Sequence, residues 1–293
     1  MFRLAHISDI HLAPLPTPRF AELISKRGLG YLNWLRKRRA IHRPEVLAAL
    51  IGDLKAQAPD HVAVTGDLIN LSLSNEFAPA RAWLEQLAAP NRATFVPGNH
   101  DAYVAATVGH AARDWGDYMR GDKNDTFPFV RRRGPVALIG LSSALPTLPL
   151  AATGRIGKQQ LIRLGDVLAA LKDEHLFRIV LLHHPPLSSV NRFRRLTDAS
   201  ELREVLRKHG AELVLHGHLH ESSLTWLSGP WASIPCVGTP SASAAPEGHD
   251  EPAGYNLFEI DGEPGDWQCT VIARGMSRDD GTIGEVSRQM LTG

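Results

Sequence analysis

Short apolar runs alternate along the chain with segments of helical periodicity. Five of the runs end in a polar cluster: "FRLAHISDIH", "HVAVTGD", "RATFVPGNHD", "RIVLLHHPP" and "AELVLHGHLH". Their length and composition are typical of buried strands. Between them, apolar residues recur at three- and four-residue spacing, which predicts helices over residues 45–56, 76–88, 158–173 and 199–208. This alternation predicts the α/β class.

The pattern changes after about residue 221, where strand-like pieces follow one another without a helix between them. We expect these strands to pair antiparallel in a second sheet, so that two sheets with helices outside form one domain over residues 1–274. Residues 143–156 and 238–254 are rich in Pro, Ala, Ser and Gly and are expected to be long loops. Residues 275–293 are polar and weakly patterned, so we expect a loosely held tail.

Composition indicates an ordinary globular protein, because 43% of the 293 residues are hydrophobic and the net charge is only +1. This balance gives no global reason to expect nucleic acid as a partner. Two cysteines, Cys236 and Cys269, are too few for a disulfide framework. No signal peptide and no apolar run of eighteen residues is evident, so we expect a cytoplasmic protein without a spanning segment. The sequence gives no indication of the oligomeric state.

The polar clusters at the strand ends consist of residues with metal or proton chemistry. They are Asp9, His11, Asp67, Asn99, His100, Asp101, His183, His184, His218 and His220. Loops at the carboxyl ends of parallel strands converge, so we expect all five clusters to meet in one place. In an extended chain, Asp9 and His11 point to the same side because side-chain direction alternates, and His218 and His220 repeat this spacing.

Carboxylate, imidazole and amide oxygen ligands together suit manganese, iron or zinc better than an all-oxygen magnesium site. The cysteines lack the spacing of a structural zinc finger. The ligand-type residues outnumber the ligands that a single ion needs. Two divalent ions that share Asp67 as a bridging carboxylate are therefore the economical solution.

In order along the chain, "DIH" (9–11), "GD" (66–67), "GNHD" (98–101), "HHPP" (183–186) and "GHLH" (217–220) resemble the signature of the calcineurin-like metallophosphoesterases. The resemblance implies a four-layer β-sandwich flanked by helices and a dinuclear metal centre. It assigns Asp9, His11, Asp67 and His220 to one ion, and Asp67, Asn99, His183 and His218 to the other. By the same analogy the first histidine of "HHPP", His183, is the ligand, and His184 remains the alternative.

The resemblance also implies hydrolysis of a phosphoric ester by a hydroxide that bridges the two metal ions. Asn99 would offer an amide oxygen to one ion, and His100 would point to the substrate. There His100 would stabilise phosphoryl oxygens or protonate the leaving oxygen. We expect Asp101 to hold the imidazole of His100 in one tautomer. Nine other histidines, among them His6, His61 and His216, are interpreted as structural.

Residues 19–43 form a basic, amphipathic insertion directly after the first motif. The segment contains eight basic residues and one acid, Glu22, with Phe20, Tyr31, Trp34 and several leucines between them. Two interpretations remain open. The segment is either an ordinary helical pair with solvated arginines or a cap that contacts an anionic membrane or a polyanionic substrate. "NRFRR" (191–195) adds positive charge near the same opening.

Three functions therefore compete. The first is a soluble phosphodiesterase acting on a small diester, such as a cyclic nucleotide or a glycerophosphodiester. The second is a peripheral membrane hydrolase of a lipid-linked phosphate or pyrophosphate, as in lipid A pathway members of the superfamily. The third is a metal-binding scaffold without catalysis. Nuclease activity is disfavoured, because the sequence shows no extended basic stripe and no separate nucleic-acid module.

Overall fold

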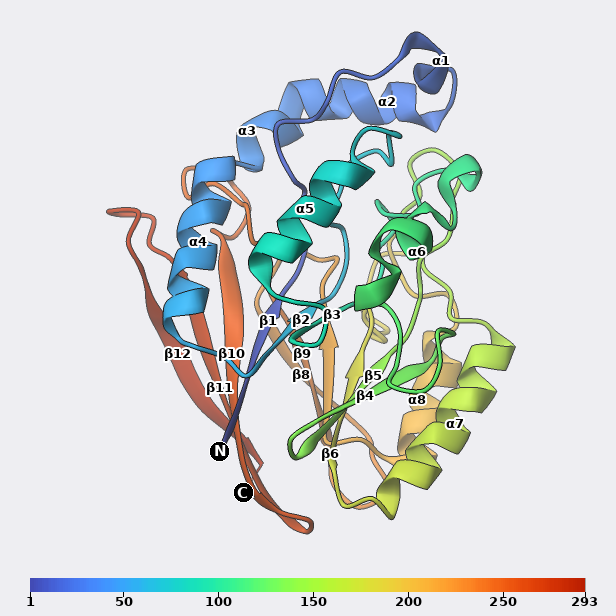
Figure 1. Cartoon of the computed structure of the whole chain (residues 1–293), viewed down its shortest axis with the longest axis vertical. Coiled ribbons are helices and arrows are strands. Elements are labelled where there is room, and N and C mark those ends of the chain that lie inside the picture. The colour runs from blue at the N-terminus through green and yellow to red at the C-terminus, as the bar shows by residue number, and fades with distance from the viewer. Residues whose placement is uncertain (293) are drawn as a thin grey trace.

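Two six-stranded β-sheets pack face to face in the computed structural model, which describes residues 1–292 (Figure 1). The first sheet has the order β12-β11-β10-β1-β2-β3 and the second the order β4-β5-β6-β7-β9-β8. The first consists of β1 (Phe2–Ile7), β2 (His61–Val64), β3 (Ala93–Phe95), β10 (Gly254–Glu263), β11 (Asp266–Met276) and β12 (Ile283–Thr292). The second consists of β4 (Phe129–Arg133), β5 (Val136–Gly140), β6 (Phe177–Leu181), β7 (Leu213–His216), β8 (Ser223–Leu227) and β9 (Ile234–Gly238).

Helices cover the outer faces of both sheets. Helices α4 (Pro44–Ala56) and α5 (Phe77–Leu87) lie on the first sheet, and α7 (Lys158–Lys172) and α8 (Ala199–His209) lie on the second (Figure 1). The predicted helix ends agree with these to within one residue. Helix α6 (His110–Trp115) lies between the 3-10 turns η2 (Ala105–Thr107) and η3 (Gly116–Tyr118). The predicted α/β sandwich flanked by helices is therefore confirmed.

The central strands are buried on both faces, which explains their continuous apolar runs. In β6, for example, Ile179 points into the core between the two sheets, and its neighbour Val180 points to the core beneath α7 and α8. Leu213 and Val214 in β7 divide in the same way. Side chains on the two faces alternate with period two, so each run serves two hydrophobic layers.

Strand direction determines where the chain delivers its polar residues. Strands β1, β2 and β3 run parallel to one another, as do β5, β6, β7 and β9. Both chain termini lie at the end of the molecule opposite the first helices, as Figure 1 shows. The carboxyl ends of both parallel sets lie together at the other end, where the motif residues lie.

The strands after residue 221 divide between the two sheets instead of forming one antiparallel unit. Strand β9 joins the second sheet parallel to β7, with β8 antiparallel at the edge. Strand β10 pairs antiparallel with β1, and β11 and β12 continue the first sheet. The segment expected to be a loosely held tail instead forms β12, which pairs with β11 up to Thr292. Residues 143–156 and 238–254 contain loops without named strands or helices beyond their ends, as expected.

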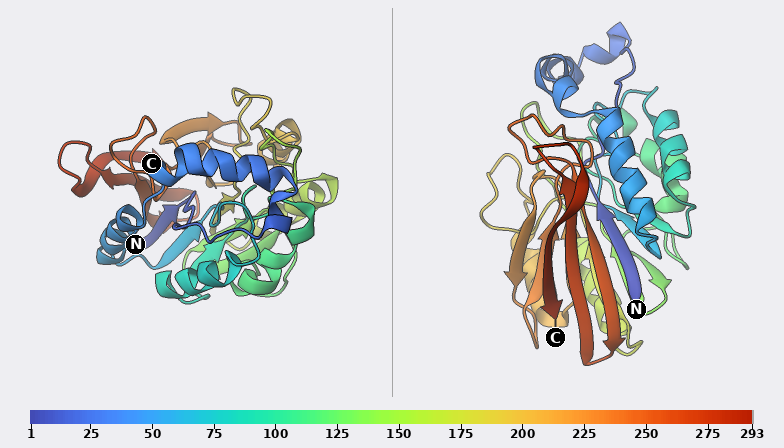
Figure 2. Two further views of the ribbon diagram at one scale, coloured as in Figure 1. Left: turned by 90° about the horizontal axis from the view of Figure 1, so that it is seen from above. Right: turned by 90° about the vertical axis from the view of Figure 1, so that its left-hand side faces the viewer.

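Residues 20–41 form what we call the helical arm. It comprises α1 (Phe20–Leu23), α2 (Lys26–Asn33), the π-helical turn η1 (Trp34–Arg38) and α3 (Arg39–Ile41), and it lies across the end that carries the motif loops (Figure 2). Arg27 anchors the arm by donating from Nε to the Leu71 carbonyl at 2.9 Å, and Trp34 packs in a small core with Leu15 and Leu73. None of the helices within residues 1–292 is long and apolar enough to cross a membrane.

Candidate metal centre

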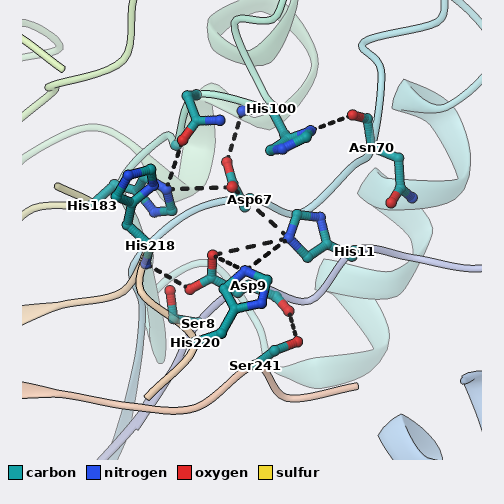
Figure 3. Close-up of polar contacts among 12 residues, drawn as sticks. Ser8, Asp9, His11, Asp67, Asn70, His100, His183, His218, His220 and Ser241 are labelled. Atoms are coloured by element: carbon teal, nitrogen blue, oxygen red, sulfur yellow. Dashed lines mark hydrogen bonds and ion pairs between the residues drawn. The ribbon is translucent and has the colours of Figure 1, made fainter. Parts of the chain in front are cut away.

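Seven side chains from five strand ends lie together beyond the sheets, and all of them except Asn99 are labelled in Figure 3. They are Asp9 and His11 after β1, Asp67 after β2, Asn99 after β3, His183 after β6, and His218 and His220 after β7. Six of them are buried, and the side chain of His220 is 16% exposed. The structure thus brings together all seven residues that the sequence singles out as metal ligands.

The first half of the site surrounds Asp9. Its Oδ1 lies 3.1 Å from His220 Nε2 and 4.0 Å from His11 Nε2, and the two imidazole nitrogens are 3.4 Å apart. Asp67 borders this group, with Oδ2 at 3.9 Å from His11 Nε2. Four donor atoms from three loops therefore face one small space.

The second half lies on the other side of Asp67. His183 Nε2 is 3.3 Å from Asp67 Oδ2 and 3.3 Å from Asn99 Oδ1. The ring of His218 lies 5.1 Å from that of His183, measured between centroids. Asp67 Oδ2 is the oxygen near both His11 and His183, so this carboxylate stands between the two groups.

Backbone carbonyls orient the histidines. His11 Nδ1 lies 3.3 Å from the Ile69 carbonyl, His183 Nδ1 lies 2.6 Å from the Thr65 carbonyl, and His218 Nε2 lies 2.8 Å from the Arg194 carbonyl. A carbonyl can only accept, so each of these nitrogens carries the proton. The opposite nitrogen then presents a lone pair, which is the arrangement that metal-bound histidines show.

The backbone at the site adopts an unusual conformation. Asp9, His11, Asp67, His218 and His220 all have positive φ, between 43° and 72°. Such a conformation costs about 1–3 kcal/mol for a residue other than glycine and is concentrated at functional sites. The shared direction of Asp9 and His11 was predicted from the alternation of side chains along an extended chain. That reason was wrong, because β1 ends at Ile7 and both residues follow it in left-handed turns.

Two glycines make room for the carboxylates. A methyl group added at Gly217 would overlap Ser8 Oγ and lie 2.5 Å from Asp9 Oδ2. One added at Gly98 would overlap Asp67 Oδ1 and lie 2.6 Å from the Asp67 nitrogen. The motif glycines therefore allow the backbone of neighbouring loops to approach the carboxylates more closely than any other residue permits.

The charges of the site fit a pair of cations. Asp9 and Asp67 are buried, and no lysine or arginine within residues 1–292 lies in ion-pair distance of either. Asp9 Oδ1 is buried without a hydrogen bond. Burial opposes charging of His183, yet the nearby Asp67 and Asp9 carboxylates raise its pKa to about 9. The electrostatic field between Asp9 and Asp67 thus favours positive charge, and two buried carboxylates need a positively charged partner to offset the loss of solvation.

Asp101 does not contact the imidazole of His100, so that part of the sequence prediction was wrong. Its Oδ2 accepts hydrogen bonds from the backbone N–H groups of Asp67 and Gly98, both at 2.8 Å, and its Oδ1 accepts from Leu68 at 2.9 Å and Ile69 at 3.3 Å. Burial and the Asp67 charge push the pKa of Asp101 upward, whereas four N–H donors favour the carboxylate. Asp101 therefore shapes the loop that carries Asp67.

His100 takes its orientation from other groups. Its Nδ1 contacts the Asn70 carbonyl, and its Nε2 lies 3.0 Å from the Arg38 guanidinium (Figure 3 shows the Asn70 contact). Because the carbonyl must accept, Nδ1 carries the proton and Nε2 accepts from Arg38. A second nitrogen of Arg38 lies 3.4 Å from His11 Nε2. The helical arm therefore reaches into the site.

His42 is a further site residue that sequence reasoning missed. Its ring lies 4.4 Å from that of His11 and 5.9 Å from that of His220, and its Nδ1 lies 2.9 Å from Ser243 Oγ. A signal for it exists in the sequence, because Arg38 and His42 are four residues apart in a helical segment and so share a face. The His42 N–H indeed bonds the Arg38 carbonyl at 2.9 Å.

His184 lies behind the two groups. Its Nδ1 is 2.8 Å from Ser143 Oγ, and a methyl group at Gly154 would overlap its ring. Its ring centroid is 4.4 Å from that of His218. Between the two histidines of "HHPP", the geometry therefore favours His183 as the ligand, with His184 packed against the loop 143–156.

Comparison with known proteins identifies a family and relatives of this chain. Residues 2–222 match the calcineurin-like phosphoesterase family. A probable cyclic nucleotide phosphodiesterase of Synechococcus is 28% identical over 234 residues, which cover 76% of this chain and 80% of the relative. Another from Rhodococcus erythropolis is 28% identical over 198 residues, covering 65% and 60%. A dimetal phosphatase from Danio rerio superimposes with a TM-score of 0.67 at 13% identity, covering 99% and 98%, and supports the fold.

We predict that Asp101→Asn lowers the free energy of unfolding by about 1–3 kcal/mol, because an amide leaves at least one buried N–H donor without an acceptor. Urea unfolding measures this change. Asp166→Asn on α7, an exposed position, is the control. Equal stability of the two variants would contradict the role of Asp101 in the Asp67 loop.

We also predict that Gly217→Ala displaces Ser8 and Asp9 and weakens metal binding roughly ten-fold or more, a loss typical of a disturbed ligand environment. Gly52→Ala in α4, where an added methyl group has no neighbour within 4 Å, should leave metal affinity unchanged. Calorimetric titration of both variants with Mn²⁺ or Zn²⁺ tests this. Wild-type affinity in Gly217→Ala would show that the close approach is not needed.

Proposed function

The chain belongs to the calcineurin-like phosphoesterases and is a metal-dependent phosphoric ester hydrolase, and from this premise we propose that it cleaves a small phosphodiester. The observation that carries the proposal is the convergence of seven donor side chains whose lone pairs face a shared space around Asp67. The names of the two curated relatives support a diester as substrate. A cyclic nucleotide and a glycerophosphodiester are the two candidate types.

We assign Asp9, His11, Asp67 and His220 to one divalent ion, and Asp67, Asn99, His183 and His218 to the other. Manganese, iron and zinc suit this mixture of nitrogen and oxygen donors. When bound, two such ions supply charge neutralisation at the phosphoryl oxygens and acidify a water molecule. His42 packs against the first group and supports the rings of His11 and His220.

Arg38 is the cation of the helical arm that we propose as a ligand for the phosphoryl group. It forms no ion pair within residues 1–292, and its guanidinium faces the imidazoles of His100 and His11. A guanidinium that lacks a carboxylate partner at a partly buried site is a strong donor for a phosphate oxygen. An incoming phosphodiester supplies this missing anion.

We propose that His100 positions Arg38. The Nδ1–H group of His100 donates to the Asn70 carbonyl, so Nε2, which faces the site, is a hydrogen-bond acceptor. Nε2 accepts from the Arg38 guanidinium and thereby fixes its orientation. Of the two roles that the sequence suggests, stabilisation of phosphoryl oxygens through Arg38 fits this arrangement better than protonation of the leaving oxygen, which requires a proton on Nε2.

A lipid-linked phosphate or pyrophosphate is a second candidate substrate. The exposed leucines and basic residues of the helical arm, directly beside the site, favour it. A metal-binding scaffold without catalysis is the remaining alternative, and activity measurements distinguish it from both.

We predict that the metal-loaded protein hydrolyses bis-p-nitrophenyl phosphate faster than the monoester, because the one positive charge of Arg38 beside the donor set matches the single negative charge of a diester. Removal of metal by a chelator should abolish activity, and Mn²⁺, Fe²⁺ or Zn²⁺ should restore it. Faster turnover of the monoester would contradict the diester assignment. Stoichiometric metal binding without turnover on a panel of nucleotide and lipid diesters would support the scaffold.

We further predict that Arg38→Met lowers kcat/KM for a soluble diester roughly 10–100-fold, the effect expected for loss of one charge-assisted hydrogen bond. His100→Ala should cost a similar factor, and the double variant should cost no more than either, because the two residues act as a unit. The inhibition constant for inorganic phosphate should rise in parallel. Arg43→Met, at an exposed arginine beyond the arm, is the matched control.

The leaving group distinguishes the two roles of His100. A positioning residue slows esters of good and poor leaving groups by the same factor. If His100→Ala slows the ester of a poor leaving group far more, His100 is a general acid and the positioning role is refuted.

A further inference from the structure

Large apolar side chains are exposed around the opening of the site. Within residues 1–292, eight of the fifteen exposed large hydrophobic residues belong to three neighbouring segments, with exposures between 45% and 91%. They are Phe20, Ile24, Leu29, Leu32, Leu35, Leu148, Leu150 and Phe193. We call the surface formed by residues 19–41, 147–152 and 191–195 the rim. An apolar surface of this extent on a polar background marks an interaction site.

The rim also concentrates positive charge. It contains ten basic residues and one acid, Glu22, although the whole chain has a net charge of +1. The remainder of the chain is therefore net acidic. The exposed members are Arg19, Arg36, Lys37, Arg39, Arg192, Arg194 and Arg195. Glu22 accepts hydrogen bonds from the backbone N–H groups of Arg19 and Ser74, and within residues 1–292 it forms no ion pair with the basic residues of the rim.

Hydrogen bonds join the three segments into one surface. Lys26 Nζ donates to Thr147 Oγ1 at 3.0 Å, and the Ala152 N–H donates to the Phe193 carbonyl at 2.8 Å. Arg194 donates to the carbonyl of His218 at 2.7 Å, which fixes the third segment to the metal centre. The view in Figure 2 from the end that carries the helical arm shows the arm lying across the motif loops.

Helix geometry separates the two faces of the arm. Arg27, Tyr31, Trp34 and Arg38 recur at three- and four-residue spacing and face the protein, where Arg27 and Trp34 are buried. Leu29, Leu32 and Leu35 lie outside this face and are 54%, 48% and 45% exposed. The leucines thus do not belong to the core, and the arm presents apolar side chains to solvent beside the face that contacts the protein.

We propose that the rim binds the surface of an anionic lipid bilayer. Exposed leucine, isoleucine and phenylalanine insert at the boundary between headgroups and acyl chains, while lysine and arginine beside them pair with anionic lipids. A nucleic acid would use the charges but not the aliphatic side chains. Because the basic residues are concentrated in the rim, its charge is complementary to that of an anionic membrane. A protein bound through the rim has the opening beside Arg38 turned toward the headgroups.

This inference goes beyond the proposed hydrolysis and does not depend on it. Its test is co-sedimentation of the metal-loaded full-length protein with vesicles of phosphatidylcholine alone or mixed with phosphatidylglycerol, in about 0.05 M and about 0.5 M salt. The protein should pellet with the anionic vesicles at low salt only. R36S/K37S/R39S should lower the partition coefficient roughly a hundred-fold, because each lost basic residue lowers it by about ten-fold or less and the three effects multiply. L32S/L35S should lower it roughly ten-fold, through lost apolar burial.

The matched control is K158S/R163S/K208S, which removes three exposed basic residues from α7 and α8, away from the rim, and should bind as the wild type does. Thermal unfolding of each variant verifies that it is folded. Failure of the wild type to pellet, equal binding to neutral vesicles, or full binding by R36S/K37S/R39S would overturn the proposal. If R36S/K37S/R39S loses vesicle binding but L32S/L35S binds as the wild type does, the rim recognises charge alone, as a site for a soluble polyanion would. That outcome would also overturn the proposal. Turnover of a soluble diester, measured on the same samples, reports separately on the site.

Discussion

Two buried carboxylates, Asp9 and Asp67, impose the constraint on which the rest of the structure depends. They lie where the carboxyl ends of the two parallel strand sets meet, without a lysine or arginine in ion-pair distance within residues 1–292. Uncompensated charges of this kind are strongly unfavourable in a protein interior. Backbone carbonyls orient the imidazoles of His11, His183 and His218 so that the opposite ring nitrogen of each is directed to the carboxylates, and together these groups form a cation site.

The same constraint explains the unusual backbone around the site. Five of the seven donor residues lie at or next to left-handed turns, and Gly98 and Gly217 let neighbouring loops approach the carboxylates. Asp101 offsets part of the free-energy cost of these backbone conformations, because it accepts hydrogen bonds from four backbone N–H groups in two loops. Glu76 likewise accepts from the N–H groups of Asn70, Leu71 and Leu73. The carboxylates of Asp101 and Glu76, which do not face the site, therefore stabilise the strained backbone that carries the ligand residues.

The sequence predicted most of the fold and the donor set, because periodicity marks the buried strands and each motif follows a strand directly. It could not predict which sheet the C-terminal strands join, since pairing of β10 with β1 depends on backbone contacts between residues 250 or more positions apart. Asp101 was misassigned for the same reason. Its partners at 67–69 lie more than thirty residues earlier, and proximity in sequence suggested His100 instead.

The helical arm shows how one short segment can serve two purposes. Its inner face reaches the metal centre through Arg38 and His42, four residues apart, while its outer face exposes the leucines of the rim. The π-helical turn η1 (Trp34–Arg38) lies between these functions, with the Arg39 N–H bonded to the Trp34 carbonyl. Wide turns of this kind are frequent at functional sites. Trp34, the first residue of this turn, is fixed in its own small core, and Arg38, the last, contacts His100 and His11, so the turn joins the anchored part of the arm to the metal centre.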